Sequence, residues 1–451
     1  MVTAGKHPGN SERNHQSGIP NWQERASSTS GRECQQPLRA QDFRMKILIY
    51  SHVFSPSIGG VEKSVQSLAE GLDEVRGPEI NGGFKVTLVT QTAAGAFDNS
   101  AFSFAVVRRP TLTKLWRLVR ESDIVHIAGP SLVPLLLAFL ACKPVVVEHH
   151  GYQAICPNGL LSYQPSRTIC PGHFQERRYW KCWRCQNYEL SPQRSLLSLL
   201  RMFPRSWLVR RAARNLAITR HVRDRHKLPR AEVVYYGIED PLAKGNASLP
   251  PADPRDRILF GFVGRFVPEK GIPILLEAVR QLISEGETFD VRLIGDGPER
   301  DALDTMIRRE KLENHIRITG YLAGAALAES LRDVRVVVMP SVWEETAGLA
   351  AIEQMMRGRL VIASDIGGLS EVVGGTGLCF APGNAIALAE CMRRVLHQPT
   401  LIDAMGREAR LRALSLFARR WMIDEHRRVY REVTDSATTW AEQNLPQSGI
   451  H

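Results

Sequence analysis

Short apolar runs recur along the chain from Met45 onward, and stretches with helical periodicity separate several of them. Helix-like stretches lie at 61–72 and 111–120, among the first of these runs. Alternation of this kind predicts a parallel sheet covered by helices. The β-rich runs of this first series are residues 46–50, 85–90, 102–107, 123–127, 144–148, 215–219 and 232–235.

A second series of the same kind begins after residues 241–257, a segment rich in proline and polar residues that predicts a linker. Its apolar runs are residues 258–263, 290–294, 316–319, 335–339, 360–363 and 377–380. Helical stretches lie between the runs, and a helical region extends to residue 433. We therefore expect an α/β protein with two Rossmann-like, doubly wound domains, 45–240 and 258–433.

The two ends of the chain differ from the domains in composition. Residues 1–44 are rich in Gly, Ser, Gln, Asn and Arg and lack the apolar core of a signal peptide, which predicts a disordered extension. Met45 is then a second candidate start of translation, and residues 434–451 are expected to form a flexible tail. The longest nearly uncharged apolar stretch, 132–142, is too short to span a bilayer, so we expect a cytoplasmic protein.

One segment makes the protein basic. The whole chain carries a formal net charge of +11. Residues 160–230 contain 16 Lys and Arg against 3 Asp and Glu, a net charge of +13, so the remaining residues are nearly balanced.

Two carboxylates stand on either side of an expected helix start in the second domain. In Glu345-Thr-Ala-Gly348-Leu-Ala-Ala-Ile-Glu353, the first carboxylate falls on the loop after a strand and the second falls inside the helix. Ligands of α/β proteins bind at the carboxyl ends of parallel strands, and a helix start offers free N–H groups to an anion. The pair suits a polyhydroxylated ligand attached to a diphosphate. Two solvated glutamates beside an amphipathic helix are the alternative.

Glycines and cations follow two other strands. Gly264-Arg265 and Lys270-Gly271 come after the first apolar run of the second domain, and Gly59-Gly60 comes after the first run of the chain. Two fixed cations suit a diphosphate leaving group, because they neutralise its departing charge. Glycines at such a turn let the backbone approach a phosphate or a sugar closely.

In this order and combination, the motifs resemble those of the glycosyltransferases of family four, which have the GT-B fold. The run Asp365-Ile-Gly367-Gly368 is similar to that family's helix-opening loop. The resemblance covers residues 45–433 and is strongest in the second domain. It implies two Rossmann-like domains facing a central cleft, and a retaining hexosyl transfer from a nucleotide-sugar that needs no metal cofactor for catalysis.

The resemblance also implies roles for individual residues. Arg265 and Lys270 would contact the donor diphosphate, Glu345 the hydroxyls of the donor sugar, and Glu353 the ribose. His150 would lie beside the transferred sugar. The implied catalytic residues are His150, Arg265, Lys270 and Glu345. The implied substrate-binding residues are Gly59, Gly60, Arg265, Lys270, Glu345, Thr346, Gly348, Leu349 and Glu353.

Two positions depart from the family's pattern. Gly151 stands where the family commonly has Asp, and Tyr236 stands where it often has Asn, which weakens the expectation of a polar role there. His126 and His149 are expected to be structural histidines.

No side chain is placed as a covalent nucleophile, so we expect front-face attack by the acceptor hydroxyl, whose proton passes to the departing β-phosphate oxygen.

Four cysteines cluster in the basic segment of about residues 151–230, which we expect to be a Cys-rich insert of the first domain. Cys156, Cys170, Cys182 and Cys185 have the spacing Cys-x13-Cys-x11-Cys-x2-Cys, and His173 is an alternative ligand. Four thiolates can form a tetrahedral structural zinc site. Because only one close pair is present, the sequence is compatible with a structural zinc site and also with four reduced thiols.

The same segment interleaves apolar and basic residues over 195–211. This composition suits the surface of an anionic membrane. A helix that packs its apolar face internally and solvates its arginines is the alternative.

The leading hypothesis is a retaining glycosyltransferase that uses a UDP- or GDP-sugar and a saccharide, glycolipid or lipid-linked acceptor, with peripheral attachment to the cytoplasmic membrane face. A nucleotide-sugar epimerase of GT-B fold is one alternative. A zinc-stabilised nucleic-acid-binding protein is the other, although the basic segment has few of the aromatic residues typical of single-strand binders. Nucleic acid is therefore not an expected partner.

Overall fold

The computed structural model describes residues 45–57, 59–74, 83–95, 98–243 and 257–444, with only the backbone described for 437–444. The predicted extension 1–44, the linker residues 244–256 and the last residues of the predicted tail lie outside the described residues.

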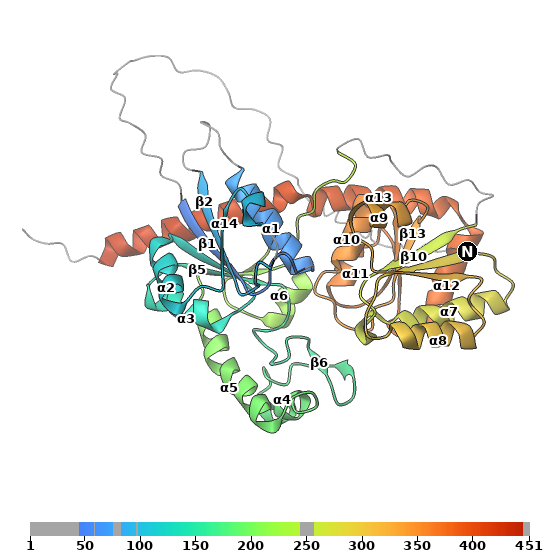
Figure 1. The fold of residues 1–451 in the computed structure, drawn as a ribbon, viewed down its shortest axis with the longest axis horizontal. Coiled ribbons are helices and arrows are strands. Elements are labelled where there is room, and N and C mark those ends of the chain that lie inside the picture. Colours follow the sequence, from blue (N-terminus) through green and yellow to red (C-terminus); the bar gives the residue numbers. More distant parts are fainter. Residues whose placement is uncertain (1–44, 58, 75–82, 96–97, 244–256, 445–451) are drawn as a thin grey trace, which may run out of the picture. The chain divides into compact units, whose positions relative to one another are not determined.

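Within the described residues, seven strands form the first sheet, and each pair of neighbours in it is parallel. Their order is β3-β2-β1-β4-β5-β8-β9, and helices lie on both faces of the sheet (Figure 1). The strands are β1 (Met45–Ser51), β2 (Phe84–Thr90), β3 (Ala105–Arg108), β4 (Ile124–Ala128), β5 (Val145–His149), β8 (Arg214–Ala217) and β9 (Ala231–Val233). The helices of this part are α1 (Gly60–Asp73), η1 (Asn99–Ala101), α2 (Leu112–Glu121), α3 (Leu132–Leu140) and α6 (Arg220–His226).

Six strands of the described chain form the second sheet, in the order β12-β11-β10-β13-β14-β15. Each pair of neighbouring strands in it is parallel as well. The strands are β10 (Leu259–Val263), β11 (Asp290–Ile294), β12 (Ile316–Gly320), β13 (Val336–Met339), β14 (Leu360–Ser364) and β15 (Leu378–Phe380). The helices are η2 (Pro268–Lys270), α7 (Ile272–Ser284), α8 (Arg300–Arg309), α9 (Gly324–Ser330), α10 (Leu349–Met356), α11 (Gly367–Val373), α12 (Ala385–His397) and α13 (Thr400–Leu416).

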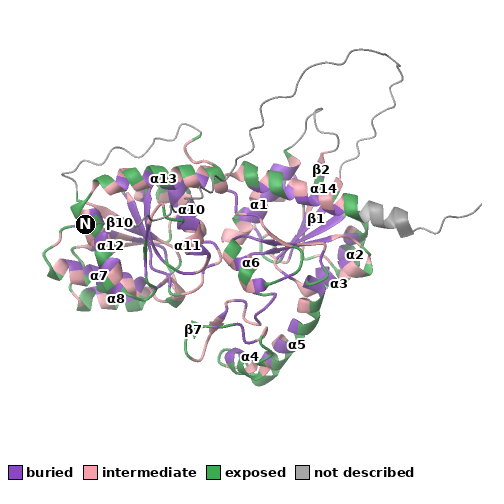
Figure 2. Ribbon diagram, turned by 180° about the vertical axis from the view of Figure 1, so that it is seen from behind, coloured by how far each residue is buried: buried purple, intermediate pink, exposed green. Residues whose placement is uncertain are grey.

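The apolar runs of the sequence coincide with these strands. The central strands β4, β5, β13 and β14 are buried along their whole length, as expected for parallel strands covered by helices on both faces. Figure 2 shows buried strands at the centre of each sheet and exposed outer faces on the surrounding helices. The predicted α/β class with two Rossmann-like sheets is confirmed.

The last helix differs from the prediction. The sequence predicts that the helices up to residue 433 belong to the second domain and that a flexible tail follows. Instead, α14 (Arg419–Asn444) packs against α1, beside the first sheet, and continues to Asn444. Met422, Val429, Tyr430 and Val433 of α14 are buried with strand residues of the first sheet. The apolar face of α14 is therefore buried against the first sheet rather than against the second.

The basic segment 151–230 is only partly an insertion. Its later residues form β8, a strand of the first sheet, and α6, which packs against β8 and β9. The earlier residues form a short antiparallel hairpin and two helices outside that sheet. These elements are β6 (Ser162–Tyr163), β7 (Thr168–Ile169), α4 (Tyr179–Gln186) and α5 (Pro192–Val209).

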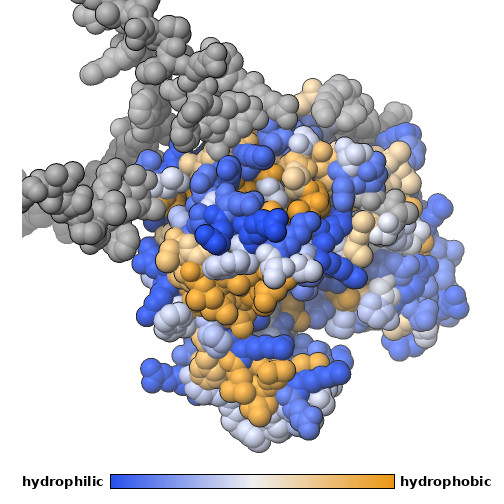
Figure 3. Space-filling view, turned by 60° about the vertical axis from the view of Figure 1, so that its left-hand side comes forward, coloured by the Kyte–Doolittle hydropathy of each residue, from blue (hydrophilic) through white to orange (hydrophobic). Residues whose placement is uncertain are grey.

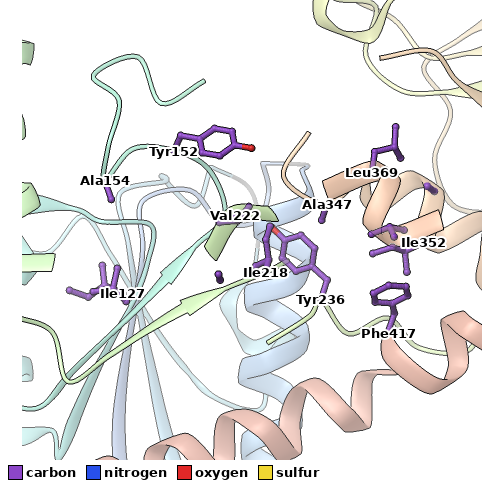
Figure 4. Packing of buried hydrophobic residues seen from close by; sticks show 14 of the residues in the cluster. Ile127, Tyr152, Ala154, Ile218, Val222, Tyr236, Ala347, Ile352, Leu369 and Phe417 are labelled. Atoms are coloured by element: carbon purple, nitrogen blue, oxygen red, sulfur yellow. The ribbon is translucent and has the colours of Figure 1, made fainter. Parts of the chain in front are cut away.

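Buried apolar side chains from both sequence halves form one contiguous cluster. Figure 4 shows part of it, with Tyr236 and Ile218 near Ala347, and with Phe417 near Ile352. This packing supports the loops that carry the candidate site.

Candidate functional site

The candidate site lies at the point where the strand order of the second sheet reverses. The chain runs from β10 outward to β11 and β12, then returns to place β13 on the other side of β10. The loops after β10 and β13 therefore start from neighbouring strand ends. Doubly wound sheets bind their ligands at such a point. A backbone hydrogen bond of 3.0 Å from Val342 N–H to Glu269 O joins these two loops.

Lys270 and Glu345 meet between these loops. Lys270 lies in η2, and its Nζ is 2.8 Å from Oε1 of Glu345. Glu345 is 4% exposed, and the hydroxyl of Ser341 donates a hydrogen bond to the same oxygen. The lysine side chain is 21% exposed, so a cation and a positioned carboxylate are both available at this strand end.

Arg265 follows β10 and is exposed. The turn that carries it packs on the loop after β11, where Phe266 N–H donates to Asp296 O at 2.8 Å. A Cβ atom on Gly295 would lie 1.8 Å from the carbonyl oxygen of Gly264, so only glycine permits this approach of the two loops. The close approach of Gly295 to Gly264 thus supports the backbone beside Arg265.

The helix after Glu345 starts as the motif predicted. Gly348 precedes α10 in the left-handed region with φ 73°, and Thr346 and Leu349 flank it, both partly buried. The backbone N–H of Gly368 donates to Glu345 O at 2.6 Å, which ties the start of α11 to this loop. Thr346 O accepts a hydrogen bond of 2.7 Å from the Thr219 hydroxyl of the first domain.

Glu353 lies on α10, and its Oε1 is 3.1 Å from Nζ of Lys63 on α1. Gly59 and Gly60 open α1, and a Cβ on Gly60 would lie 3.1 Å from a methyl carbon of Leu349. The structure therefore brings the glycine motif of the first domain close to the start of α10.

His150 belongs to a different buried group. Its Nδ1 is 2.8 Å from the Tyr236 hydroxyl, and the two rings stack with centroids 5.6 Å apart. Its Nε2 is 3.5 Å from Oε2 of Glu148. Among the described residues, no hydrogen bond or ion pair joins His150 to Lys270 or Glu345. Tyr236 thus has a polar role that the sequence analysis did not expect.

Burial lowers the pKa of His150 below its ordinary value, and it lowers the pKa of the neighbouring His149 to about 3. Both imidazoles are therefore neutral near pH 7. His149 Nε2 is 3.0 Å from Oδ1 of Asn215, which is the contact of a structural histidine.

Some residues of the site were missed by sequence reasoning. Ser341 and Lys63 are the partners of Glu345 and Glu353. Glu371 accepts hydrogen bonds of 2.9 Å from the backbone N–H groups of Arg220 and His221. Ser341 stands directly after a strand end, which is a usable signal, whereas no pattern along the chain links Lys63 or Glu371 to residues so distant in sequence.

The four clustered cysteines line one small cavity together with His173. All five residues are buried, and the cavity has a volume of about 10 Å³, enough for one small occupant. The Nδ1 atom of His173 has no hydrogen-bond partner among the described residues. Burial raises the pKa of Cys156 to about 11 and that of Cys182 to about 12, so without a metal both are neutral thiols. Thiols and an imidazole are the donor types that structural zinc sites use.

Helices α3 and α5 contact each other and expose large apolar side chains. Helix α5 buries four apolar side chains, yet five others are exposed, so internal packing accounts for only one side of it. The buried ones are Leu199, Met202, Leu208 and Val209. Figure 3 shows apolar surface gathered in two adjoining areas of this face. The exposed residues are Val133, Leu136, Leu140, Leu196, Leu197, Leu200, Phe203 and Trp207.

Arginines border this apolar surface, which we call the α3–α5 surface. The guanidinium of Arg211 lies 3.8 Å from the ring centroid of Trp207, and Arg194, Arg201 and Arg210 are exposed. No helix in the described part of the chain is both long and apolar enough to cross a membrane.

Two family models match the chain. The model described as Glycosyltransferase Family 4 matches residues 58–240, and the model described as Glycosyl transferases group 1 matches residues 250–412. The two matches coincide with the two sheets.

Curated relatives match over part of their length. A 2-deoxystreptamine glucosyltransferase of Streptomyces kanamyceticus is 35% identical over 169 residues, 37% of this chain and 41% of the relative. An alpha-D-kanosaminyltransferase of the same organism is 28% identical over 239 residues, 50% of this chain and 62% of the relative. The chain thus spans about two fifths to three fifths of the length of these relatives.

Solved structures share the fold. The chain superposes on Anabaena HepE, crystallised with UDP and glucose, with a TM-score of 0.64 and 19% identity, covering 86% of this chain and 100% of that one. It superposes on sucrose-phosphate synthase of Thermosynechococcus elongatus with a TM-score of 0.61 and 20% identity, covering 87% and 100%.

Proposed function

The chain belongs with the family-four glycosyltransferases of GT-B fold, and we propose that it transfers a sugar from a nucleotide-sugar to a hydroxyl acceptor with retention of configuration. The donor is a UDP- or GDP-sugar, and the acceptor is a saccharide, a glycolipid or a lipid-linked saccharide. Catalysis by this chain's own side chains needs no metal ion.

The Lys270–Glu345 pair is the observation that carries this proposal. A lysine 2.8 Å from a buried carboxylate, at the strand ends where the second sheet reverses its order, supplies charge for a phosphate and an acceptor for sugar hydroxyls. Ser341 fixes the carboxylate, and the exposed Arg265 adds a second cation nearby in sequence.

The reaction follows from this placement. Lys270 and Arg265 hold the diphosphate of the donor, and Glu345 accepts hydrogen bonds from sugar hydroxyls. The acceptor oxygen forms a bond to the anomeric carbon on the face from which the phosphate oxygen departs. That oxygen takes the acceptor's proton as the bond to the anomeric carbon breaks, while the two cations neutralise its charge.

The test uses the purified full chain. Thermal unfolding is measured with UDP-, GDP- and ADP-sugars, because a ligand that binds only the folded state raises the melting temperature. The stabilising donor is then incubated with hydroxyl acceptors, and the anomeric configuration of the product is read by NMR. Retained configuration supports the proposal, whereas an inverted product contradicts it.

Other activities give different results in the same experiments. Conversion of the nucleotide-sugar without an acceptor, at the rate found with one, would indicate an epimerase. A salt-sensitive gel shift with RNA or DNA, without stabilisation by any nucleotide-sugar, would indicate a nucleic-acid-binding protein.

For the cysteine cavity we propose a structural zinc ion held by Cys156, Cys170, Cys182 and Cys185, with His173 as the alternative to one thiolate. The common cavity of the five residues and the unpartnered Nδ1 of His173 support this proposal. Zinc would keep its thiolate ligands deprotonated and would join the β6–β7 hairpin to α4.

Replacing Cys182 with serine is expected to remove one equivalent of zinc and to destabilise the hairpin and α4, because three remaining ligands hold the ion far more weakly. Elemental analysis of the reduced, tag-free protein measures the metal. The matched control is Cys142→Ser, which changes an exposed cysteine and should leave the zinc content unchanged. Equal zinc content in the Cys182→Ser variant and the parent protein would remove the cysteine site.

The α3–α5 surface is, in our proposal, a docking surface for an anionic membrane. Exposed apolar side chains beside four arginines match the apolar interior and the negative headgroups of such a surface. Attachment there would bring a lipid-linked acceptor to the enzyme.

The double variant Leu200→Ser/Trp207→Ser is expected to bind vesicles at least tenfold more weakly, because each apolar side chain contributes about 1.5 kcal/mol or more when buried. Cosedimentation with phosphatidylcholine vesicles, with and without phosphatidylglycerol, measures the binding. Trp421→Ser is the matched control, since Trp421 is 43% exposed and also carries an arginine over its ring, but lies on α14. Binding that ignores phosphatidylglycerol, or that is equal in the variant and the control, would contradict the proposal.

A further inference from the structure

A buried group of histidines surrounds one carboxylate beside the first sheet. These residues are not part of the loops that carry Lys270 and Glu345. Glu148 lies in β5, His126 in the neighbouring β4, and His426 in α14. Their exposed fractions are 2%, 0% and 0%. A buried carboxylate needs a compensating positive charge, and imidazole nitrogens with a carboxylate oxygen are common ligands of divalent transition metals.

The donor atoms of these residues converge. Nε2 of His126 is 3.2 Å from Oε2 of Glu148, and Nε2 of His426 is 3.8 Å from the same oxygen. The three donor atoms lie within 4.8 Å of one another. Metal–ligand distances of about 2.0–2.1 Å place neighbouring ligands of a tetrahedral zinc ion roughly 3.4 Å apart, and the distances of 3.2 and 3.8 Å to the Glu148 oxygen lie on either side of this value.

Each histidine is oriented through its other ring nitrogen. Nδ1 of His426 is 2.8 Å from the carbonyl oxygen of Met422. A carbonyl only accepts, so this Nδ1 carries a proton, and Nε2 is the ring nitrogen that faces Glu148. Nδ1 of His126 is 2.9 Å from the Tyr430 hydroxyl, an outer contact of the kind that orients metal-binding histidines.

A buried imidazole nitrogen that faces a carboxylate oxygen needs a proton or a metal ion between the two atoms. Nε2 of His426 has no hydrogen-bond partner among the described residues, and the same holds for Nε2 of His150, 3.5 Å from the Glu148 oxygen. His150 is oriented in the same way, through Nδ1 and the Tyr236 hydroxyl. A divalent cation satisfies all of these atoms at once.

We propose that His126, Glu148 and His426 bind a divalent transition-metal ion, and that Nε2 of His150 is within reach as a fourth ligand. Zinc fits this set of imidazole and carboxylate donors best. The ion would be structural: it joins α14 to β4 and β5 and sets the orientation of the His150 ring. This inference does not depend on the proposed transfer reaction or on the cysteine site.

The complete burial of the ligands decides how the ion is detected. An ion enclosed by residues that are at most 2% exposed enters as the chain folds and resists removal by a chelator afterwards. The full chain, without a histidine tag, is therefore produced in medium with added zinc, dialysed against EDTA and measured by elemental analysis for all first-row transition metals.

The parent protein is compared with the variants Cys182→Ser, Glu148→Gln and His397→Gln. Cys182→Ser is expected to retain one equivalent of metal, and Glu148→Gln is expected to contain one equivalent less than the parent. His397→Gln is the control for adventitious binding, because His397 is an exposed histidine that pairs with Glu287, and it should retain the parent's metal content.

X-ray absorption gives a second readout that requires no change in the buried group. In the Cys182→Ser protein we expect a first shell of nitrogen and oxygen only, at about 2.0–2.1 Å. A folded Cys182→Ser protein without metal would overturn the proposal, since a protonated imidazole would then balance Glu148. A sulfur-only first shell in that protein would also overturn it. If Glu148→Gln does not fold, the first shell of the Cys182→Ser protein decides.

Discussion

Replacing Lys270 with alanine is expected to lower the turnover of sugar transfer about a hundredfold, the usual effect of losing one preorganised charge contact with a developing oxyanion. The departing diphosphate gains charge as its bond to the sugar breaks, and the ammonium at 2.8 Å from Glu345 is fixed where it can neutralise that charge. Steady-state kinetics with the identified donor measure the change in kcat and in kcat/KM.

The loss of the cation can be separated from a loss of structure. Alanine at position 270 leaves Glu345 buried without its partner, so thermal unfolding must be recorded beside the kinetics. Lys270→Arg keeps a positive charge and should recover part of the turnover, while Lys114→Ala, which changes an exposed lysine on α2, should have parent activity. Unchanged turnover in Lys270→Ala would exclude Lys270 from the mechanism.

Replacing Gly295 with alanine is expected to destabilise the second domain by about 3 kcal/mol or more, the combined size of a strained backbone and an overpacked contact. Gly295 has φ 148°, and an added Cβ would lie 1.8 Å from the carbonyl oxygen of Gly264. Since the clash is with backbone, the turn beside Arg265 must move. Calorimetry should show the second domain melting roughly 6–12 °C lower, and donor binding should be lost with the turn.

Gly286→Ala is the matched control for this effect. Gly286 also has a positive φ, 87°, but an added Cβ there would meet nothing within 4 Å. The control therefore carries only the cost of the left-handed backbone, about 1 kcal/mol. Equal melting temperatures for the two variants would mean that the contact between Gly295 and Gly264 does not constrain the turn.

The two predictions address different requirements of the same site. Lys270 supplies charge at the end of a strand, and Gly295 allows the backbone of two loops to approach so that the turn beside Arg265 keeps its conformation. A Gly295→Ala protein that folds but no longer binds donor would show how much of donor affinity depends on this backbone contact.

The periodic pattern of apolar residues was sufficient to predict most of the fold. Fully buried strands such as Val336–Met339 are continuous apolar runs, and a run of that kind between helical stretches has few other stable arrangements than a parallel sheet. The motif Glu345 to Glu353 predicted its own local structure correctly, because a loop with a glycine before a helix is decided by neighbouring residues.

Contacts between distant segments were not predictable in this way. Nothing along the chain indicates that α14 returns to the first sheet, that Tyr430 reaches His126, or that Lys63 pairs with Glu353. The polar role of Tyr236 is of the same kind, since its hydroxyl meets His150 only after β5 and the segment following β9 are brought together.

Local sequence thus predicted the strands, the helix starts and the chemical character of the candidate donor site, because backbone geometry and burial of a strand or helix depend on residues a few positions apart. The tertiary structure decided which carboxylate each cation faces, which helix covers the first sheet, and that His126, Glu148 and His426 converge. These arrangements depend on the packing of elements that are far apart in the sequence. His126 and His426, for example, are 300 residues apart, and their side chains meet only when the core closes around them.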